Sequence, residues 1–399
     1  MRITSGSGLH HLLWKSFSRL AIGVVLSSVV LSCIPAMPPL PAVPRAERGR
    51  LRVAILAPLS GELATYGRIV RQAAELAFDE WNARHSGGIF IESIAEDTPC
   101  DAMHARQVTE RIIAAGVRFV VGGICSEAAI PIASVVDKRG ALFIAMSATH
   151  PLVTIDAQGN TRPRVFRTTF TYAQQGRAVS RFVLQTLRLD RVAVVNNPES
   201  PFAREVVAAF NESFTRRGGY VLSITVDRGQ PSDFIEHLDA QMMSDVQAVY
   251  VPDDYAAVVR VRDALWQKGI SRPVLGSDGW NIHAVRLAAG EDVYLVAHYS
   301  AQVADPTAQQ WAARYRAAFA VEPDTLAALA YDAAMLLAQG IEQSQSTSPE
   351  AVAGALSVVD YEGVTGRWRF DVQHNPLKRA FFLRVQDGTL QFAGSADVE

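Results

Sequence analysis

The 399-residue sequence has little of what most often reveals a function. It contains three cysteines, and no CxxC pair or His/Cys spacing that would indicate a metal site. Only four of the 38 basic residues are lysine, and acidic and basic residues are mixed along a chain of net charge −2. Without a basic patch, the sequence indicates no nucleic-acid partner.

Motifs of common enzymes and cofactor-binding proteins are also missing. The first strand-to-helix turn reads APLSGELATYG (57–67) and lacks G-x-G-x-x-G, and the chain has no Walker A, H-E-x-x-H or G-x-S-x-G sequence. A missing motif does not exclude a hydrolytic triad, but no residues of the sequence indicate one. We therefore expect no enzyme and no cofactor.

No apolar run is long enough to span a bilayer. The longest N-terminal run, LAIGVVLSSVVL (20–31), has about twelve residues and follows Arg2, Lys15 and Arg19, which is typical of a signal peptide. It ends in a segment that resembles a bacterial lipobox, so we expect residues 1–33 to be a lipoprotein signal with Cys33 lipidated and anchored to the membrane. A plain secretory signal with an incidental cysteine is the alternative.

The next segment and the other two cysteines fit an exported protein. Residues 34–49 are expected to be an extended tether, because IPAMPPLPAVPRAE (34–47) contains five prolines. With Cys33 assigned to lipid, Cys100 and Cys125 remain as one pair, and export favours a disulfide between them. Two free buried thiols are the alternative.

From residue 51 onward, apolar strand-like runs alternate with segments of helical spacing. One series runs from a strand at 51–57 to a strand at 141–146, and a second from a helix at 173–187 to a strand at 273–276. Helices at 308–319, 325–342 and 349–356 and a strand-rich stretch at 364–393 follow. This alternation predicts an α/β fold with parallel sheets, and the length predicts two Rossmann-like lobes.

Two polar loops follow strands within the segment from Gly122 to Thr149. Cys125 and Ser126 come after the run RFVVGGI (118–124), and Ser147, Ala148 and Thr149 come after ALFIAM (141–146). Ligands of parallel sheets bind where strands end, and free N–H groups at helix starts suit a carboxylate. The serine and threonine side chains could instead be ordinary N-caps.

These segments together resemble the periplasmic branched-chain amino-acid-binding proteins, the leucine/isoleucine/valine type of ABC-transporter substrate receptors. The resemblance covers about residues 50–399. It is carried by these segments: PLSGELATYG (58–67), AEDTPCD (95–101), VGGICSEAAIPIAS (121–134), AMSATHP (145–151), FRTTFTYAQQG (166–176) and LGSDGW (275–280).

The resemblance implies a type I periplasmic-binding-protein fold, in which two lobes close on a ligand like a Venus flytrap. The N-terminal lobe is expected to comprise 50–169 plus 301–357, and the C-terminal lobe 170–300 plus 358–399. Three crossovers, expected near 168–172, 297–303 and 356–362, would join the lobes.

The resemblance also implies a site for the zwitterionic head of an amino acid. The ligand carboxylate would meet Ser126 and the backbone N–H and hydroxyl of Thr149. The ammonium group would meet the Ser147 carbonyl, the Thr149 hydroxyl and Asp278, with Ala148 in the same loop. Tyr66 would cover the ligand side chain; its alternative is an ordinary packed tyrosine.

The second half departs from the family's pattern around the ligand side chain. Phe202 replaces a usual tyrosine and loses its hydroxyl, and Asp278 stands where a longer glutamate is common. VPDDY (251–255) replaces a glycine-rich turn. Asp253 or Asp254 could pair with a polar ligand side chain or cap the next helix, and Asp254 is counted among the ligand-binding residues.

The resemblance therefore implies the solute-binding protein of an ABC importer, which captures an amino acid, branched-chain or similar, and delivers it to the permease and ATPase. We expect an exported, membrane-anchored monomer. The alternative is a receptor of the same fold that senses an amide or an aromatic acid and signals rather than transports.

Overall fold

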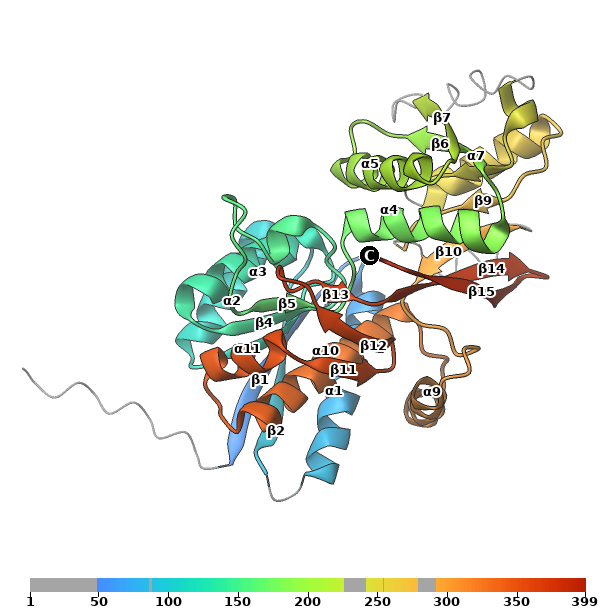
Figure 1. Ribbon diagram of the computed structural model, residues 1–399. Coiled ribbons are helices and arrows are strands. Elements are labelled where there is room, and N and C mark those ends of the chain that lie inside the picture. Colours follow the sequence, from blue (N-terminus) through green and yellow to red (C-terminus); the bar gives the residue numbers. More distant parts are fainter. Residues whose placement is uncertain (1–48, 86–87, 226–241, 254, 279–291) are drawn as a thin grey trace, which may run out of the picture. The chain divides into compact units, whose positions relative to one another are not determined.

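The computed structural model describes residues 49–399 except 86–87, 226–241, 254 and 279–291 (Figure 1). The predicted roles of Cys33, Asp254 and the tether up to residue 48 therefore fall outside the described residues. Among the helices that are described, none has the length and apolar character needed to cross a bilayer.

A five-stranded parallel sheet forms from the first series of elements, in the order β2-β1-β3-β4-β5. Its strands are β1 (Arg50–Ala57), β2 (Phe90–Asp97), β3 (Phe119–Gly122), β4 (Leu142–Ala145) and β5 (Val165–Arg167). The helices between them are α1 (Ala64–Arg84), α2 (Ala102–Ala114) and α3 (Ser126–Arg139), with a short 3₁₀ turn η1 (Pro151–Val153).

The inner strand β1 is apolar, which fits the burial of both of its faces. Val53 and Ile55 lie in a core with α1 and with α10 (Thr325–Ser344), whereas Ala54 and Leu56 lie in a core with α2 and α3. The first core also contains residues of α9 (Pro306–Phe319) and α11 (Pro349–Ser357).

A seven-stranded sheet forms from the second series, in the order β15-β14-β10-β9-β8-β6-β7. Its parallel strands are β6 (Arg191–Asn196), β7 (Tyr220–Thr225), β8 (Ala248–Tyr250), β9 (Val274–Leu275) and β10 (Val293–Ala297). Two antiparallel strands, β14 (Arg379–Gln386) and β15 (Thr389–Asp397), complete it. Its helices are α4 (Tyr172–Arg181), continued by a π-helical segment η2 (Phe182–Leu187), α5 (Pro201–Arg216) and α7 (Tyr255–Gln267); a 3₁₀ turn η3 (Met242–Asp245) precedes β8.

The chain passes between the two sheets three times. The first passage, between β5 and α4, and the second, between β10 and α9, lie where crossovers were expected. The third passage does not lie at 356–362. The antiparallel strands β11 (Asp360–Gly363), β12 (Gly366–Phe370) and β13 (Pro376–Leu377) form a small sheet of their own.

The small sheet belongs to the first half because its aromatic residues complete the first core. Tyr361, Trp368 and Phe370 are buried in the same cluster as Val53 and Ile55. The chain therefore joins the second sheet only at β14, and assigning residues 358–377 to the C-terminal lobe was wrong. The α/β fold with two mainly parallel sheets is confirmed.

Candidate functional site

The loop between β3 and α3 brings Ser126 to the carboxyl end of the first sheet. Gly122 ends β3 with a φ of 145°, and a Cβ there would collide with the backbone oxygen of Leu56 in β1. Cys125, not Ser126, occupies the N-cap of α3. The Ser126 hydroxyl instead accepts a hydrogen bond from the backbone N–H of His150 at 3.3 Å, so the N-cap alternative for Ser126 was wrong.

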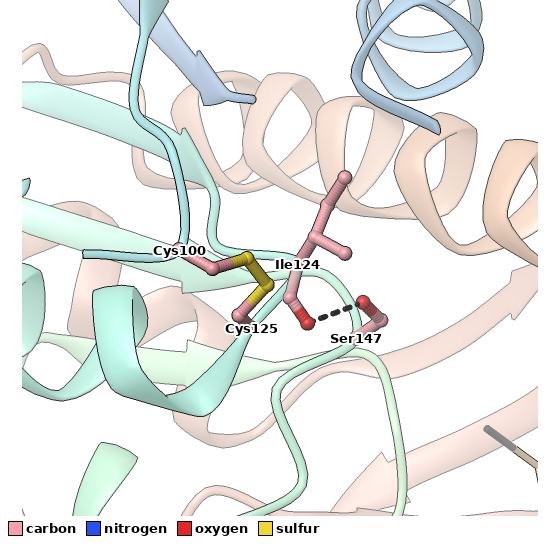
Figure 2. Close-up of a disulfide and its surroundings, with 4 residues drawn as sticks. All are labelled: Cys100, Ile124, Cys125 and Ser147. Carbon is pink, nitrogen blue, oxygen red and sulfur yellow. Dashed lines mark hydrogen bonds between the residues drawn. A yellow bond between two sulfur atoms is a disulfide. The ribbon is translucent and has the colours of Figure 1, made fainter. Parts of the chain in front are cut away.

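The loop that follows β4 is bonded directly to the first one. The backbone N–H of Met146 donates to the Gly122 carbonyl at 2.8 Å, and the Ser147 hydroxyl donates to the Ile124 carbonyl at 3.0 Å (Figure 2). We call residues 122–126 and 146–150 the two-loop platform. Ala148 is buried in it, and Thr149 comes next.

A disulfide braces this platform. Cys100, which follows β2, is bonded to Cys125, with the two Cα atoms 5.6 Å apart (Figure 2). The predicted disulfide is confirmed, and the alternative of two free thiols was wrong. Because Cys125 directly precedes Ser126, the bridge restrains the start of α3 beside the Ser126 hydroxyl.

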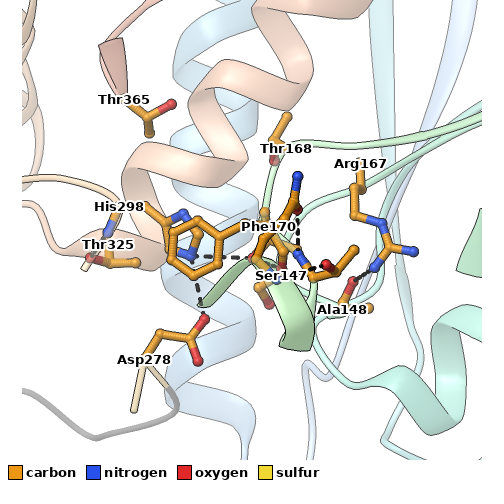
Figure 3. Close-up of polar contacts among 12 residues, drawn as sticks. Ser147, Ala148, Arg167, Thr168, Phe170, Asp278, His298, Thr325 and Thr365 are labelled. Carbon is orange, nitrogen blue, oxygen red and sulfur yellow. Dashed lines mark hydrogen bonds and ion pairs between the residues drawn. The ribbon is translucent and has the colours of Figure 1, made fainter. Parts of the chain in front are cut away.

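A buried arginine that sequence reasoning did not single out fixes the second loop from β5. The Arg167 guanidinium is fully buried and donates to the Ala148 carbonyl at 2.9 Å (Figure 3). It also donates to the His150 carbonyl at 3.0 Å and to the Thr154 hydroxyl at 3.0 Å. Burial lowers the pKa of Arg167 to about 9, which still leaves it charged at neutral pH. Its position in FRTTFTYAQQG (166–176), beside the first crossover, was the available signal.

Tyr172 brings several of the predicted residues together. It is the first residue of α4, and its hydroxyl lies beside the side chains of Ser126 and Thr149. Its ring meets Phe202 of α5 edge-on, with 4.9 Å between the ring centroids, and meets His150 at 5.9 Å. Burial raises the pKa of the Tyr172 phenol, so the hydroxyl remains a hydrogen-bond donor at neutral pH.

Tyr172 was missed by the sequence analysis, although it ends the expected crossover at 168–172. It follows Thr171, whose hydroxyl accepts from the backbone N–H of Gln174 while the Gln174 side chain accepts from the Thr171 N–H. This capping box starts α4 and fixes where the ring emerges. The sequence feature that could have indicated Tyr172 is an aromatic residue at the start of a capped helix, directly after an expected crossover.

Asp278 lies just beyond β9, with 13% of its side chain exposed. One carboxylate oxygen, Oδ2, is 3.4 Å from Nε2 of His298, which follows β10 and was not predicted (Figure 3). Asp278 is thus held as a partly buried carboxylate that can accept further hydrogen bonds.

The acidic turn after β8 is partly used within the protein. Asp253 accepts a hydrogen bond from the side-chain amide of Asn197 at 3.0 Å, and its carbonyl accepts from the Ser277 hydroxyl at 3.3 Å. The polar side chain that Asp253 contacts in the structure is therefore that of Asn197, a residue of the protein itself. Its neighbour Asp254 lies outside the described residues.

Tyr66 lies in the first turn of α1 and is half-buried. The loop before it is fixed by Asp97 of β2, which accepts hydrogen bonds from the backbone N–H of Leu59 at 2.7 Å and from the Ser60 hydroxyl at 2.5 Å. Burial raises the pKa of the Asp97 carboxyl, but these hydrogen bonds outweigh it and lower the pKa overall. The covering role of Tyr66 stays a prediction.

The sequence matches the family model described as periplasmic binding protein over residues 50–389. Among curated proteins, it is 25% identical to the leucine-, isoleucine-, valine-, threonine- and alanine-binding protein of Pseudomonas aeruginosa over 324 residues, which covers 80% of this chain and 86% of the relative. It is 29% identical to the Leu/Ile/Val-binding protein BraC3 of Rhizobium johnstonii over 318 residues, which covers 77% of this chain and 83% of the relative.

A solved structure also resembles the chain. It is the branched-chain amino acid transporter substrate-binding protein LivJ from Streptococcus pneumoniae in complex with isoleucine. The two are 26% identical with a TM-score of 0.71, and the match covers 87% of this chain and 99% of LivJ.

Proposed function

This chain belongs to the periplasmic binding protein family, and from that premise we propose that it is the substrate-binding protein of an ABC importer for an amino acid, branched-chain or similar. The two curated relatives are named for binding leucine, isoleucine and valine, and one of them also for threonine and alanine. LivJ is the substrate-binding protein of a branched-chain amino acid transporter, which favours transport over the sensing alternative. The protein would bind and release its ligand unchanged.

The carboxylate end of the ligand is the part of the proposal with the strongest support. The side chains of Ser126 and Thr149 both lie beside the Tyr172 hydroxyl, so both can reach one small group. A ligand carboxylate is such a group, and it accepts hydrogen bonds on both oxygens. Their common position beside Tyr172 is the observation that carries the proposed function.

The ammonium end would be met by Asp278 together with the Ser147 carbonyl and the Thr149 hydroxyl. Because Asp278 is largely buried, its attraction to an ammonium group is weakly screened by water. A zwitterion needs donors at one end and a charged acceptor at the other. The rings of Tyr66 and Phe202 would then cover the ligand side chain.

Delivery to a permease requires the protein to be outside the cytoplasm. We propose that the signal segment exports the chain and is cleaved before Cys33, so that Cys33 becomes the N-terminus and carries the lipid anchor. The proline-rich segment would separate the anchor from the folded part, which acts as a monomer.

Isothermal titration calorimetry of the exported protein against each standard amino acid tests the proposal. We expect leucine, isoleucine or valine to bind, and Asp278→Ala to weaken that binding by about a hundredfold or more, since it leaves the ligand ammonium without its charged partner. A folded protein that binds none of the amino acids would show that the proposed function is wrong.

Asp263→Ala is the matched control for this substitution. Asp263 is an aspartate of the same half, on α7, whose carboxylate pairs with Arg262 and is 47% exposed on its side chain. Removal of the Asp263 carboxylate should leave amino-acid affinity unchanged.

A second experiment distinguishes binding from catalysis. If the bound amino acid is recovered unaltered after long incubation, the protein binds it without converting it.

A further inference from the structure

The passages between the two sheets meet around one buried histidine. His298 follows β10 at the start of the second passage and is only 1% exposed. Its ring stacks on Phe170 of the first passage, with 3.8 Å between the ring centroids, and its Nε2 lies 3.2 Å from the Thr169 hydroxyl. Its backbone N–H donates to the Thr325 hydroxyl at the start of α10 (Figure 3).

The same ring nitrogen reaches Asp278. The distance from His298 Nε2 to Asp278 Oδ2 is 3.4 Å. An ionised carboxylate only accepts hydrogen bonds, so this contact requires the hydrogen of a neutral ring to be on Nε2. The other nitrogen, Nδ1, is then an unprotonated atom, and it is buried without a hydrogen-bond partner in the described part of the chain.

The surroundings of His298 keep it neutral. Burial lowers its pKa to about 4, and the positive charge of Lys378 acts in the same direction, against the attraction of Asp278. Lys378 stands in the third passage, between β13 and β14, and is 3% exposed. A neutral imidazole can donate to Asp278 without cancelling the negative charge that an ammonium group would seek.

Lys378 is held in place by a hydrogen-bonded cluster around the buried carboxylate of Asp332. Its Nζ lies 3.3 Å from the hydroxyl of Thr365, which donates to the buried carboxylate of Asp332 at 2.6 Å. Asp332 also accepts from the backbone N–H groups of Val364 and Thr365, both at 2.9 Å, and from the Tyr361 hydroxyl at 3.0 Å. All three passages therefore present fixed polar groups to the region of His298.

We propose that His298 is a positioning residue for ligand binding: through Nε2 it holds Oδ2 of Asp278 and ties that carboxylate to the crossovers, which leaves Oδ1 to receive the ammonium group of the amino acid. This inference rests on the proposed role of Asp278. It assigns to His298 no contact with the ligand, only control over the direction and mobility of the group that makes it.

Two substitutions separate this positioning role from simple packing. His298→Leu fills most of the ring's volume but has no donor, whereas the side-chain N–H of His298→Gln can stand in for Nε2. We expect calorimetry to show about tenfold to a hundredfold weaker binding of L-leucine by His298→Leu, and near wild-type binding by His298→Gln. Equal weakening in both variants would overturn the proposal.

A ligand without the ammonium group provides a second readout. Affinity for 4-methylpentanoate, which keeps the carboxylate and side chain of leucine, should not change in His298→Leu, because no ammonium contact exists to be lost. In an Asp278→Asn background, His298→Leu should weaken L-leucine binding less than about twofold, since coupled residues are non-additive. The positioning role would be contradicted if the effects of the two substitutions on L-leucine affinity were fully additive. It would also be contradicted if His298→Leu weakened the binding of both ligands equally.

The protonation of the ring can be measured without any ligand. In protein labelled with ¹⁵N-histidine, NMR at pH 7 should show His298 as the neutral form protonated on Nε2. A ring protonated on Nδ1 would overturn the inference, whatever the protein binds. If this form is found but no amino acid binds, the proposed function fails while the His298–Asp278 bond stands, so the two failures are distinguishable.

Discussion

His298 gives the protein a specific sensitivity to acid at the scale of a single residue. Burial and Lys378 lower its pKa to about 4, whereas a histidine in an unfolded chain titrates near 6.5. Between these two values the unfolded state binds the proton and the folded state does not. The free energy of unfolding therefore falls as the pH falls from 6.5 to 4.

We expect His298→Gln to lose this part of the acid sensitivity. The difference of about 2.5 pKa units corresponds to about 3 kcal/mol in the free energy of unfolding. The wild type should lose this amount between pH 6.5 and 4, whereas the variant has no such contribution to lose. Urea denaturation at steps between pH 7 and 4 measures it. His104→Gln, which replaces an exposed histidine of α2, should keep the wild-type slope. A His298→Gln slope as steep as that of the wild type would contradict the pKa assignment.

At the scale of single residues, the sequence predicted those that belong to a short recognisable segment. Ser126, Ser147 and Thr149 lie in loops directly after strands, so the sheet brings them together. Tyr172 and His298 could not be found in the same way. Their partners are far away in the chain, and a lone aromatic residue or histidine carries no periodic signal.

At the scale of elements, the contact between α4 and α5 controls the aromatic pair beside the platform. Tyr172 stands at the first position of α4 and Phe202 near the start of α5. The helices approach closely at Gly176, where a Cβ would collide with the backbone oxygen of Val206 and lie 2.9 Å from the backbone nitrogen of Phe210. Gly176 therefore sets the helix separation on which the Tyr172–Phe202 contact depends.

We expect Gly176→Ala to destabilise the fold by about 1–3 kcal/mol, because the added methyl group meets backbone atoms that cannot rotate away. The control is Gly354→Ala in α11, where nothing lies within 4 Å of the added Cβ and where alanine should stabilise the helix by up to about 1 kcal/mol. Denaturant unfolding of both variants measures the difference. Equal stability of the two would show that α4 can move away from α5 at little cost.

The sequence predicted most elements of the two sheets because their apolar periodicity is strong. The strand expected at 191–196 is β6 to the residue. The error concerned β11 to β13, whose alternating pattern shows that they are strands but not which core they cover. Trp368 and Phe370 would fit any apolar layer, and only long-range packing puts them against the first sheet.

At the scale of the whole molecule, three passages join two sheets that have separate cores. Buried apolar residues form clusters on both faces of each sheet. The length and the alternation of elements were enough to predict this division. The position of the third passage was not predictable, because it depends on whether β11 to β13 find their partners in the first core or the second.

The disulfide acts at this scale, since it limits the unfolded chain rather than adding a contact to the folded one. Cys100 and Cys125 are 25 residues apart and enclose α2 and β3. In the chain-entropy account, closing such a loop stabilises the fold by roughly 3–4 kcal/mol. We therefore expect the double variant Cys100→Ala with Cys125→Ala to lower the free energy of unfolding by about that amount.

Amino-acid affinity should respond much less to the loss of this bridge. In the folded double variant Ser126 still begins α3 and still accepts from the His150 N–H, so leucine binding by calorimetry should weaken less than about tenfold. Urea denaturation with and without reductant provides the control, because reductant should lower the stability of the wild type and leave the double variant unchanged. Equal stability of the wild type and the double variant would mean that the loop is already ordered in the unfolded chain. A loss of affinity larger than the loss of stability would instead mean that the bridge positions Ser126 directly.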